Sequence, residues 1–339
     1  MEKSSLDTAK AGAMRFNTDS SQMEIYDGNQ WTGILATSPE LQTGGTRGVF
    51  MGGQSPHSID FINISSLGDS ATFGTSLGNA SYVAAASSRT RAIGGGAAPG
   101  NTNVIQFITF ASTGDGQDFG DLNGGRHAAT GASNGTRGLI CGGEFGSSPT
   151  YRNTIEYVTI AQTGNAVDFG DMTESKRDIG SCASPTRAII AGGYSTDPVA
   201  GSMINTIMFV TTSTLGNASN FGDLTVSRMG IGGASNAVRG IFAGAHEAAP
   251  VTNVMDFITI ASTGNAQDFG DLIRGQFRGG AASSSTRYVY YGGNNSPFRE
   301  MQYVEFSTRG NAIDFGDYSP SNQRYDIQGG GCSNGHGGL

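Results

Sequence analysis

The feature that most constrains this chain is a sequence unit that recurs from about residue 45 onward. Its clearest copy, residues 126–171, contains a polar turn ending in arginine, a Gly-Gly doublet, an alternating apolar segment, a Thr-Gly-Asn-Ala turn and a Phe-Gly-Asp triplet. The turn arginine recurs six times with a period of 44 to 52 residues, as Arg47, Arg91, Arg137, Arg187, Arg239 and Arg287. A fixed period of this length is typical of repeat architectures. We therefore expect one array of six units over residues 46–339.

Each unit reads as four short strands. In the clearest copy they cover residues 128–133, 138–142, 155–160 and 167–171. Four antiparallel strands per unit, with a glycine doublet after the second, predict the blade of a β-propeller. The first unit lacks a strand before Arg47, whereas residues 324–333 repeat the pattern of residues 228–235 after the sixth unit. The fold class is thus all-β, a six-bladed propeller whose C-terminal strand completes the first blade and closes the ring.

The unit resembles the kelch repeat. The resemblance lies in the Arg126-His127-Ala128 start, the Gly142-Gly143 doublet and the aromatic Phe169. Kelch blades usually carry a tryptophan and a shorter connection between the third and fourth strands. The resemblance therefore implies kelch-like geometry, and we carry over no kelch function.

The N-terminal part has a different pattern. Residues 1–35 predict a small β-hairpin or meander module, and residues 36–45, rich in turn formers, predict a linker. We expect one apolar face to carry Met14, Phe16, Met23, Ile25 and Trp31, with Tyr26 beside it. So few residues cannot bury such a face alone, so it must lie against another surface.

This module resembles a segment found near the ends of bacteriophage tail-fibre and other virion structural proteins. The match rests on Arg15-Phe16-Asn17-Thr18-Asp19, on Glu24-Ile25-Tyr26-Asp27-Gly28 and on Trp31. The resemblance implies attachment to other virion proteins and a homo-oligomer, with a trimer favoured. One alternative is a bacterial surface protein that acquired the module. The simplest alternative is an ordinary hairpin with no attachment role.

Composition excludes several classes of partner. With a net charge of -8 and lysine only at Lys3, Lys10 and Lys176, we expect no nucleic-acid partner. No stretch approaches the ~20 apolar residues of a membrane span, so we expect no membrane insertion. The N-terminus lacks the apolar core of a signal peptide, so we expect the chain to fold where it is made. Together with the resemblance to virion proteins, this implies a virion location, with assembly in the host cytoplasm. Cys141, Cys182 and Cys332 lack metal-ligand spacing, and the two of them in apolar strand patterns are expected to be small buried apolar residues.

No pattern predicts catalysis, a cofactor or a metal. The repeated Phe-Gly-Asp triplet reads as a packing phenylalanine with aspartates that bind backbone amides, and calcium binding by Asn165, Asp168 and Asp171 is the alternative. The six arginines read as structural groups that bind carboxylates or carbonyls, because the fold repeats them. The four histidines fall at different places in the repeat, which disfavours a metal site.

Recognition is expected in the loops between the second and third strands, because they vary while the other turns repeat. They cover residues 54–58, 97–103, 144–153, 194–205, 245–253 and 294–300. Loops on a rigid scaffold commonly carry binding residues. The candidate ligand-binding residues are Phe145, Tyr151, Arg152, Tyr194, Asp197, His246, Glu247, Phe298 and Arg299.

These loop residues lead to two readings of function. The first is a non-enzymatic virion protein that recognises a host-surface glycan or protein. The second is a glycan-degrading hydrolase or lyase, which would need two carboxylates across a groove. The bland alternative is that the loop residues are solvated and bind nothing.

Overall fold

The computed structural model describes residues 10–17, 22–33, 45–52, 57–78, 81–146, 150–196, 201–246, 251–293, 299–318 and 330–339. These residues form strands and turns without a helix, and the strands pair antiparallel. The prediction of an all-β fold is therefore confirmed. The described residues include no helix that could cross a membrane.

The chain divides into two compact units, residues 1–42 and residues 43–339. The first unit holds a three-stranded sheet in the order β1 (Met14–Asn17), β2 (Gln22–Tyr26) and β3 (Trp31–Gly33). A turn between β2 and β3 forms because the Asp27 carboxylate accepts hydrogen bonds from the amides of Asn29 and Gln30, both at 2.8 Å. Gly28 takes a φ of 104° in this turn, which glycine adopts without steric cost.

The register of this sheet corrects the expected apolar face. Met14 pairs with Ile25 and Phe16 with Met23, so these four side chains share one face. Trp31 pairs with Tyr26, and the Arg15 guanidinium lies 4.3 Å from the Trp31 ring centre. Paired residues share a face and neighbours along a strand alternate. Trp31 and Tyr26 therefore lie on the face opposite the four apolar residues, and the expectation for Trp31 was wrong.

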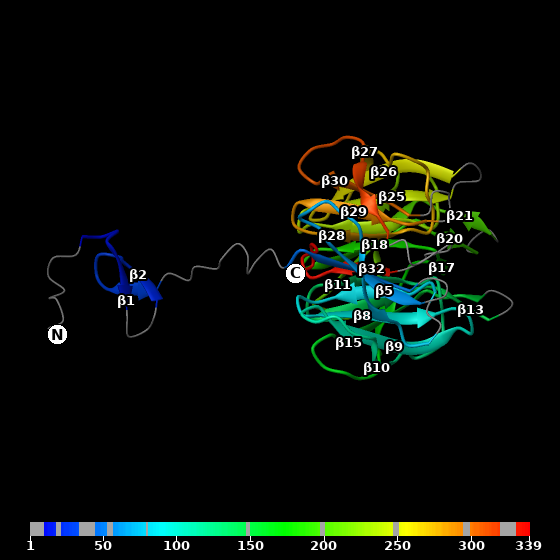
Figure 1. The fold of residues 1–339 in the computed structure, drawn as a ribbon, viewed down its shortest axis with the longest axis horizontal. Helices are drawn as coiled ribbons and strands as arrows, with labels where there is room; N and C mark the ends of the chain where they lie inside the picture. The colour runs from blue at the N-terminus through cyan, green and yellow to red at the C-terminus, as the bar shows by residue number, and fades with distance from the viewer. Residues whose placement is uncertain are drawn as a thin grey trace. The chain divides into compact units, whose positions relative to one another are not determined.

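The second unit contains six four-stranded sheets among the described residues (Figure 1). The first sheet is β32 (Gly330–Ser333), β4 (Arg47–Met51), β5 (Ser58–Asn63) and β6 (Ala71–Thr75). The second is β7 (Ala84–Ser87), β8 (Arg91–Ala97), β9 (Thr102–Thr109) and β10 (Gln117–Asp121). The third is β11 (Thr130–Ser133), β12 (Arg137–Cys141), β15 (Thr154–Thr159) and β16 (Val167–Asp171).

The remaining three sheets follow the same order. The fourth is β18 (Gly180–Ala183), β19 (Arg187–Ala191), β22 (Thr206–Thr211) and β23 (Ser219–Asp223). The fifth is β24 (Gly232–Ser235), β25 (Arg239–His246), β26 (Val251–Thr259) and β27 (Gln267–Asp271). The sixth is β28 (Gly280–Ser283), β29 (Arg287–Tyr291), β30 (Glu300–Glu305) and β31 (Ile313–Asp317).

Two small sheets extend the loops of the third and fourth repeats. The hairpin of β13 (Glu144–Phe145) and β14 (Thr150–Tyr151) follows β12. The other joins β17 (Lys176–Arg177), β20 (Tyr194–Ser195) and β21 (Ser202–Met203). In this second sheet, Arg177 pairs with Tyr194, so the segment entering the fourth sheet lies beside the loop that leaves its second strand.

The repeated arginines join each sheet to the next. Arg187, in the fourth sheet, lies 4.6 Å from the Phe209 ring centre and donates hydrogen bonds of 2.9 Å to the carbonyls of Ile260 and Ala261 in the fifth. Arg287 of the sixth sheet donates to the carbonyls of Ile64 and Ser65 in the first, at 3.2 and 3.1 Å. The predicted binding of carbonyl groups is confirmed. The equivalent donors elsewhere are Arg47, Arg91, Arg137 and Arg239.

The Phe-Gly-Asp triplet makes a second contact between sheets. Phe169 is buried, and a Cβ added at Gly170 would lie 2.5 Å from the carbonyl oxygen of Gly216 in the following sheet. At the same contact, the side-chain oxygen of Asn217 accepts a 2.9 Å hydrogen bond from the Asp171 amide of the preceding sheet. The amide acceptor is thus the turn residue of the next repeat, rather than the aspartate of the triplet as expected.

The first strands of the six sheets lie against one another. In the order β7, β11, β18, β24, β28 and β32 each contacts the next, and β32 also contacts β7. The C-terminal strand β32, red in Figure 1, pairs with β4 of the first repeat from Gly330↔Met51 to Ser333↔Gly48. The expected pairing of the C-terminal strand with the first repeat is therefore present over these residues. Residues 324–329 of the expected closing strand lie outside the described residues.

The chain beyond β32 crosses the ends of the other first strands. The Gly337 amide donates a 2.7 Å hydrogen bond to the Ser235 carbonyl. The Gly338 amide donates to His336 Nδ1 at 3.0 Å, so Nε2 carries the proton and donates to the Ser87 carbonyl, also at 3.0 Å. A Cβ at Gly338 would lie 1.8 Å from the Ser133 carbonyl oxygen, which explains the glycine.

The apolar core lies between neighbouring sheets. Ile189 and Phe221 of the fourth sheet, for example, pack in one cluster with Phe242 and Ile258 of the fifth. All three cysteines are buried, one more than the two for which burial was predicted, and none is disulfide-bonded. Burial raises the pKa of the Cys141 thiol to about 12.

Candidate functional site

Five residues at equivalent places in the repeat are joined by a series of backbone hydrogen bonds. They precede the first strands of the second to sixth sheets and have left-handed φ angles of 54° to 72°; they are Tyr82, Ala128, Asp178, Gly230 and Arg278. From Ala128 onward, the amide of each donates to the carbonyl of the one before, at 3.3, 3.0, 2.7 and 2.9 Å. We call these five residues the rim. Their backbone is nearly constant, whereas their side chains differ.

The rim surrounds a cavity of about 80 Å³ at one end of the first strands. Its walls come from all six first-strand segments and consist mainly of alanine and glycine, such as Ala84, Gly131 and Gly232. Small residues are required where strands converge so closely: a Cβ at Gly131 would lie 2.2 Å from the Ala85 carbonyl oxygen. The cavity is therefore narrow, with walls of small residues below a polar rim.

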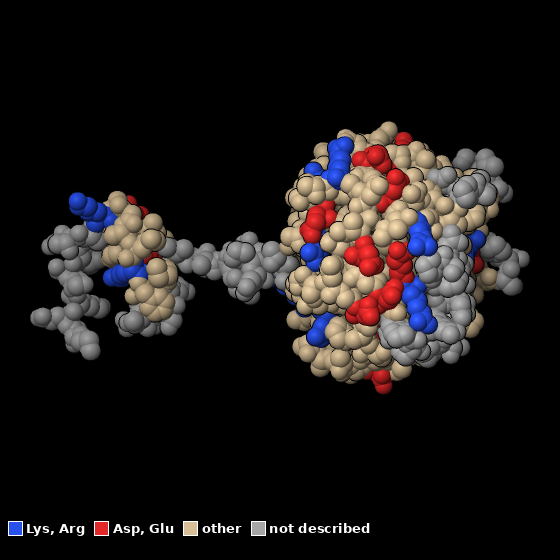
Figure 2. Space-filling model, turned by 45° about the horizontal axis from the view of Figure 1, so that its top comes forward, with Lys and Arg blue, Asp and Glu red and all other residues tan. Residues whose placement is uncertain are grey.

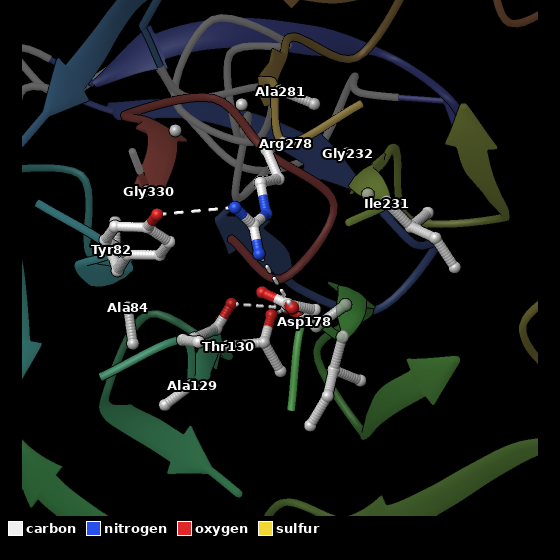
Figure 3. A pocket seen from close by; sticks show the side chains of 18 of the residues that line it. Tyr82, Ala84, Ala129, Thr130, Asp178, Ile231, Gly232, Arg278, Ala281 and Gly330 are labelled. Carbon is white, nitrogen blue, oxygen red and sulfur yellow. Dashed lines mark hydrogen bonds and ion pairs between the residues drawn. The ribbon is translucent and has the colours of Figure 1, made fainter. Parts of the chain in front are cut away.

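The guanidinium of Arg278 lies across this rim between two other rim side chains (Figure 3). Its Nη1 is 3.4 Å from the Tyr82 hydroxyl, and its Nη2 is 3.5 Å from an Asp178 carboxylate oxygen. Both distances exceed the 2.7 to 2.9 Å of a strong charge-assisted hydrogen bond. No described residue accepts a hydrogen bond from the buried Nε of Arg278.

A chain of polar side chains continues outward from Asp178. Arg177 contacts Asp178 at 3.2 Å and Glu144 at 2.9 Å. Glu144 also lies 2.9 Å from His127 Nε2, and His127 Nδ1 lies 2.6 Å from the Asn101 side-chain oxygen. These contacts place charged and polar side chains side by side around the mouth of the cavity.

The charge of Arg177 is set by this network. Burial opposes the charged form, but Asp178 and Glu144 more than offset it and raise the pKa of Arg177 above its usual value. Within this network two arginines therefore face two carboxylates, Glu144 and Asp178. The formal charges of these four groups therefore cancel.

Aromatic rings flank the same network. The Arg177 guanidinium lies 5.5 Å from the Tyr151 ring centre and 5.4 Å from that of Tyr194, and the two rings are 6.1 Å apart. The Tyr82 and His127 rings meet edge to face at 5.5 Å. The mouth therefore combines paired charges with aromatic surfaces, the groups that commonly fix a polar organic ligand.

Of the predicted loop residues, Tyr151 and Tyr194 belong to this network. Phe145 and Arg152 contact each other, with the guanidinium 5.3 Å from the ring centre, and His246 packs on Phe277 at 5.3 Å. The Arg299 carbonyl accepts a 2.7 Å hydrogen bond from the Tyr318 amide. Asp197, Glu247 and Phe298 lie outside the described residues.

Sequence reasoning missed the rim and its partners. The segments before the first strands carry Tyr82, Arg177, Asp178 and Arg278, whereas the predicted recognition loops follow the second strands. The signal was nevertheless present, because the rim positions hold dissimilar residues inside a well-kept repeat. Metal binding has no counterpart here: in the described ranges no group of three or more His, Cys, Asp and Glu residues could hold an ion.

Comparison with known proteins adds no relative. Neither a scan against protein-family models nor a search of curated proteins finds a match to this chain.

Proposed function

We propose that this chain is a non-enzymatic structural protein of a bacteriophage particle, a fibre, tail or capsid-attached subunit. Its N-terminal sheet attaches it to other virion proteins, and its second unit presents a recognition face to a host-surface glycan or protein. The observation that carries the proposal is the exposed apolar face of the N-terminal sheet, where Met14 is 66% and Phe16 58% exposed. Apolar side chains gathered on so small a sheet mark an interaction surface.

We further propose that the six sheets are the blades of a kelch-like β-propeller. The arginine contacts support this, since they run from each sheet to the next and Arg287 returns from the sixth sheet to the first. The cyclic contacts of the first strands and the pairing of β32 with β4 point the same way. Such closure leaves no open edge between the first and last repeats.

The oligomeric state follows from the same face. Met14, Phe16, Met23 and Ile25 form a self-contained apolar surface that copies of the sheet could share. A homo-oligomer buries this surface from water in a symmetric contact, and a trimer is the state we favour.

The test of attachment is removal of residues 1–40. We expect a soluble, folded, monomeric protein that is missing from purified particles, as judged by light scattering and by mass spectrometry of the particles. A sharper variant is Phe16→Glu, which places a charge on the apolar face. Its matched control is Leu77→Glu, because Leu77 is also exposed, at 40%, but belongs to the second unit. Normal incorporation of the truncated chain would overturn the proposal.

A further inference from the structure

We propose that the hairpin of β13 and β14 binds an acidic sugar of a surface glycan, with Arg152 holding the carboxylate of the sugar and Phe145 packing against its ring. This inference names the ligand class of the proposed recognition function and rests on that function. Both residues belong to the loop that follows the second strand of the third sheet, one of the loops in which the sequence predicts recognition.

The two faces of this hairpin have different surroundings. Glu144 pairs with Tyr151, and both side chains belong to the network around the cavity mouth. Phe145 pairs with Thr150, and neighbours along a strand alternate between faces, so Phe145 lies on the opposite face. Arg152 lies with Phe145, since its guanidinium is 5.3 Å from the centre of that ring. Neither of these two residues lines the cavity.

The charge of Arg152 has no acidic partner among the described residues. On the face drawn in Figure 2, by contrast, acidic and basic side chains lie next to one another. The Nε of Arg152 is buried and makes no hydrogen bond to a described residue. Its Nη1 and Nη2 are also unbonded but are not buried, so both terminal nitrogens reach solvent. A carboxylate can accept one hydrogen bond from each of them.

Two neighbours define the surroundings of this guanidinium. A Cβ at Gly124 would lie 2.9 Å from Arg152 Nη2, so glycine leaves the space that the guanidinium occupies. Burial lowers the pKa of Arg126, Glu156 opposes that shift, and the positive charge of Arg152 adds to it. Because Arg126 is already paired with Glu156, the three groups together carry one uncompensated positive charge. A single carboxylate would neutralise that charge.

The fold does not require an arginine at this place in the repeat. The Arg152 carbonyl accepts a 3.2 Å hydrogen bond from the Lys176 amide. In the second and fourth repeats the carbonyls of Thr102 and Ile204 accept the equivalent hydrogen bonds, also at 3.2 Å. A threonine and an isoleucine thus serve the same backbone contact, so the Arg152 side chain is not needed for it.

Phe145 supplies the apolar part of the site. Its side chain is 46% exposed, although it contacts the Arg152 guanidinium. Packing the C–H groups of a sugar against this ring removes apolar surface of both from water. In a uronic acid the carboxylate is bonded directly to a carbon of the sugar ring, so one residue of the glycan can contact Phe145 and Arg152 together. A neutral sugar lacks the anionic group, and inorganic phosphate lacks the ring.

The experiment measures binding of the full chain to trigalacturonic acid, to its methyl ester and to an array of acidic and neutral bacterial oligosaccharides. The ester is the same trisaccharide without charge, so we expect it to bind roughly 10-fold or more weakly than the acid. Arg152→Thr introduces the residue found at Thr102 and should weaken binding of the acid by roughly 10- to 100-fold. Phe145→Ala should weaken it by about 3- to 10-fold. Added salt should reduce the preference for the acid.

Arg309→Thr is the matched control. Arg309 also lies over a phenylalanine, 4.4 Å from the centre of the Phe257 ring, and is exposed. Its guanidinium, however, binds Gln267 Oε1 at 2.7 Å, and Phe257 is buried. This variant should bind the acid as the unchanged chain does.

The outcomes separate the site from the wider proposal. Weaker binding of the acid by Arg152→Thr and Phe145→Ala, with melting temperatures and Arg309→Thr binding retained, supports the site. Equal binding of acid and ester, full binding by Arg152→Thr, or no binding of any acidic probe overturns it. Loss of the truncated chain from particles would still support the virion role in each of these cases, because that measurement does not involve the hairpin.

Discussion

At the scale of single residues, buried charges fasten the rim to the sheets. Arg228 lies two residues before the rim residue Gly230, and its guanidinium is fully buried. It donates 3.0 Å hydrogen bonds to the Asp256 carboxylate and to the carbonyls of Phe242 and Val254. Arg126 and Glu156 form the equivalent pair in the third sheet. The segment that carries the rim is thus held by ionic and backbone contacts together.

In the fourth sheet, the acidic partner of the buried cation comes from a different position of the repeat. Met208 occupies the position of Asp256, and Lys176 occupies that of Arg228, with Glu174 as its acidic partner at 3.5 Å. Burial lowers the pKa of Lys176 to about 8, an effect that Glu174 only partly offsets. A long contact compensates poorly for lost hydration, which explains the direction of the shift.

Our first prediction concerns the Arg228 pair. Arg228→Met leaves the Asp256 carboxylate buried without its cation and should lower the free energy of unfolding by about 3–5 kcal/mol. The control is Arg274→Met, since Arg274 is 57% exposed and 3.5 Å from Glu300, a geometry in which an ion pair contributes at most about 1 kcal/mol. Urea unfolding of both variants provides the measurement. Equal effects would show that the buried pair has no special role.

At the scale of elements, the C-terminal segment connects several first strands. Residues 334–339 follow β32 and contact first strands of several sheets through His336, Gly337 and Gly338. His336 supplies a donor through Nε2 and an acceptor through Nδ1, so only the neutral imidazole satisfies both contacts. Burial lowers the pKa of His336 to about 4.

The second prediction is a pH dependence carried by this element. The unfolded chain should take up a proton at His336 near pH 6.5, whereas the folded chain resists until about pH 4. The contribution to stability is therefore complete above pH 6.5 and is lost as the pH falls toward 4, by roughly 3 kcal/mol. Chemical unfolding at several pH values should show a smaller loss for His336→Gln over this window. Parallel curves for both proteins would place the titrating group elsewhere.

At the scale of the whole molecule, repetition made most of the second unit predictable. The strand pattern, the role of the arginines and the pairing of residues 330–333 with the first repeat could be inferred because six copies expose what the fold requires. The side of the N-terminal sheet on which Trp31 lies could not be predicted, since it depends on a strand register set by one turn. Variation among the rim positions is visible in the sequence, but the contacts between rim side chains could not be predicted, because the hydrogen bond between Arg278 and Tyr82 joins residues 196 positions apart.

The last prediction tests whether the six sheets form a closed array. In an open array the sixth sheet would be terminal, and a contact from it to the first sheet would add nothing. Arg187 and Arg287 make matched contacts, each to two successive carbonyls of another sheet, but only Arg287 joins the last sheet to the first. In a closed array, the contacts of Arg187 and those of Arg287 both form. We therefore expect Arg187→Ala and Arg287→Ala each to lower the free energy of unfolding by roughly 1–3 kcal/mol, since each leaves carbonyl acceptors unpaired.

Calorimetry of both variants supplies the measurement. A closed array should unfold in a single transition, because each sheet is held by neighbours on both sides, whereas an open array can fray from its ends. The additional contact of Arg287 with Glu305, at 2.7 Å between partly exposed side chains, contributes at most about 1 kcal/mol. Glu305→Gln measures that contribution separately. An Arg287→Ala variant as stable as Glu305→Gln, beside a clearly destabilised Arg187→Ala, would mean that the first and sixth sheets are not joined in solution.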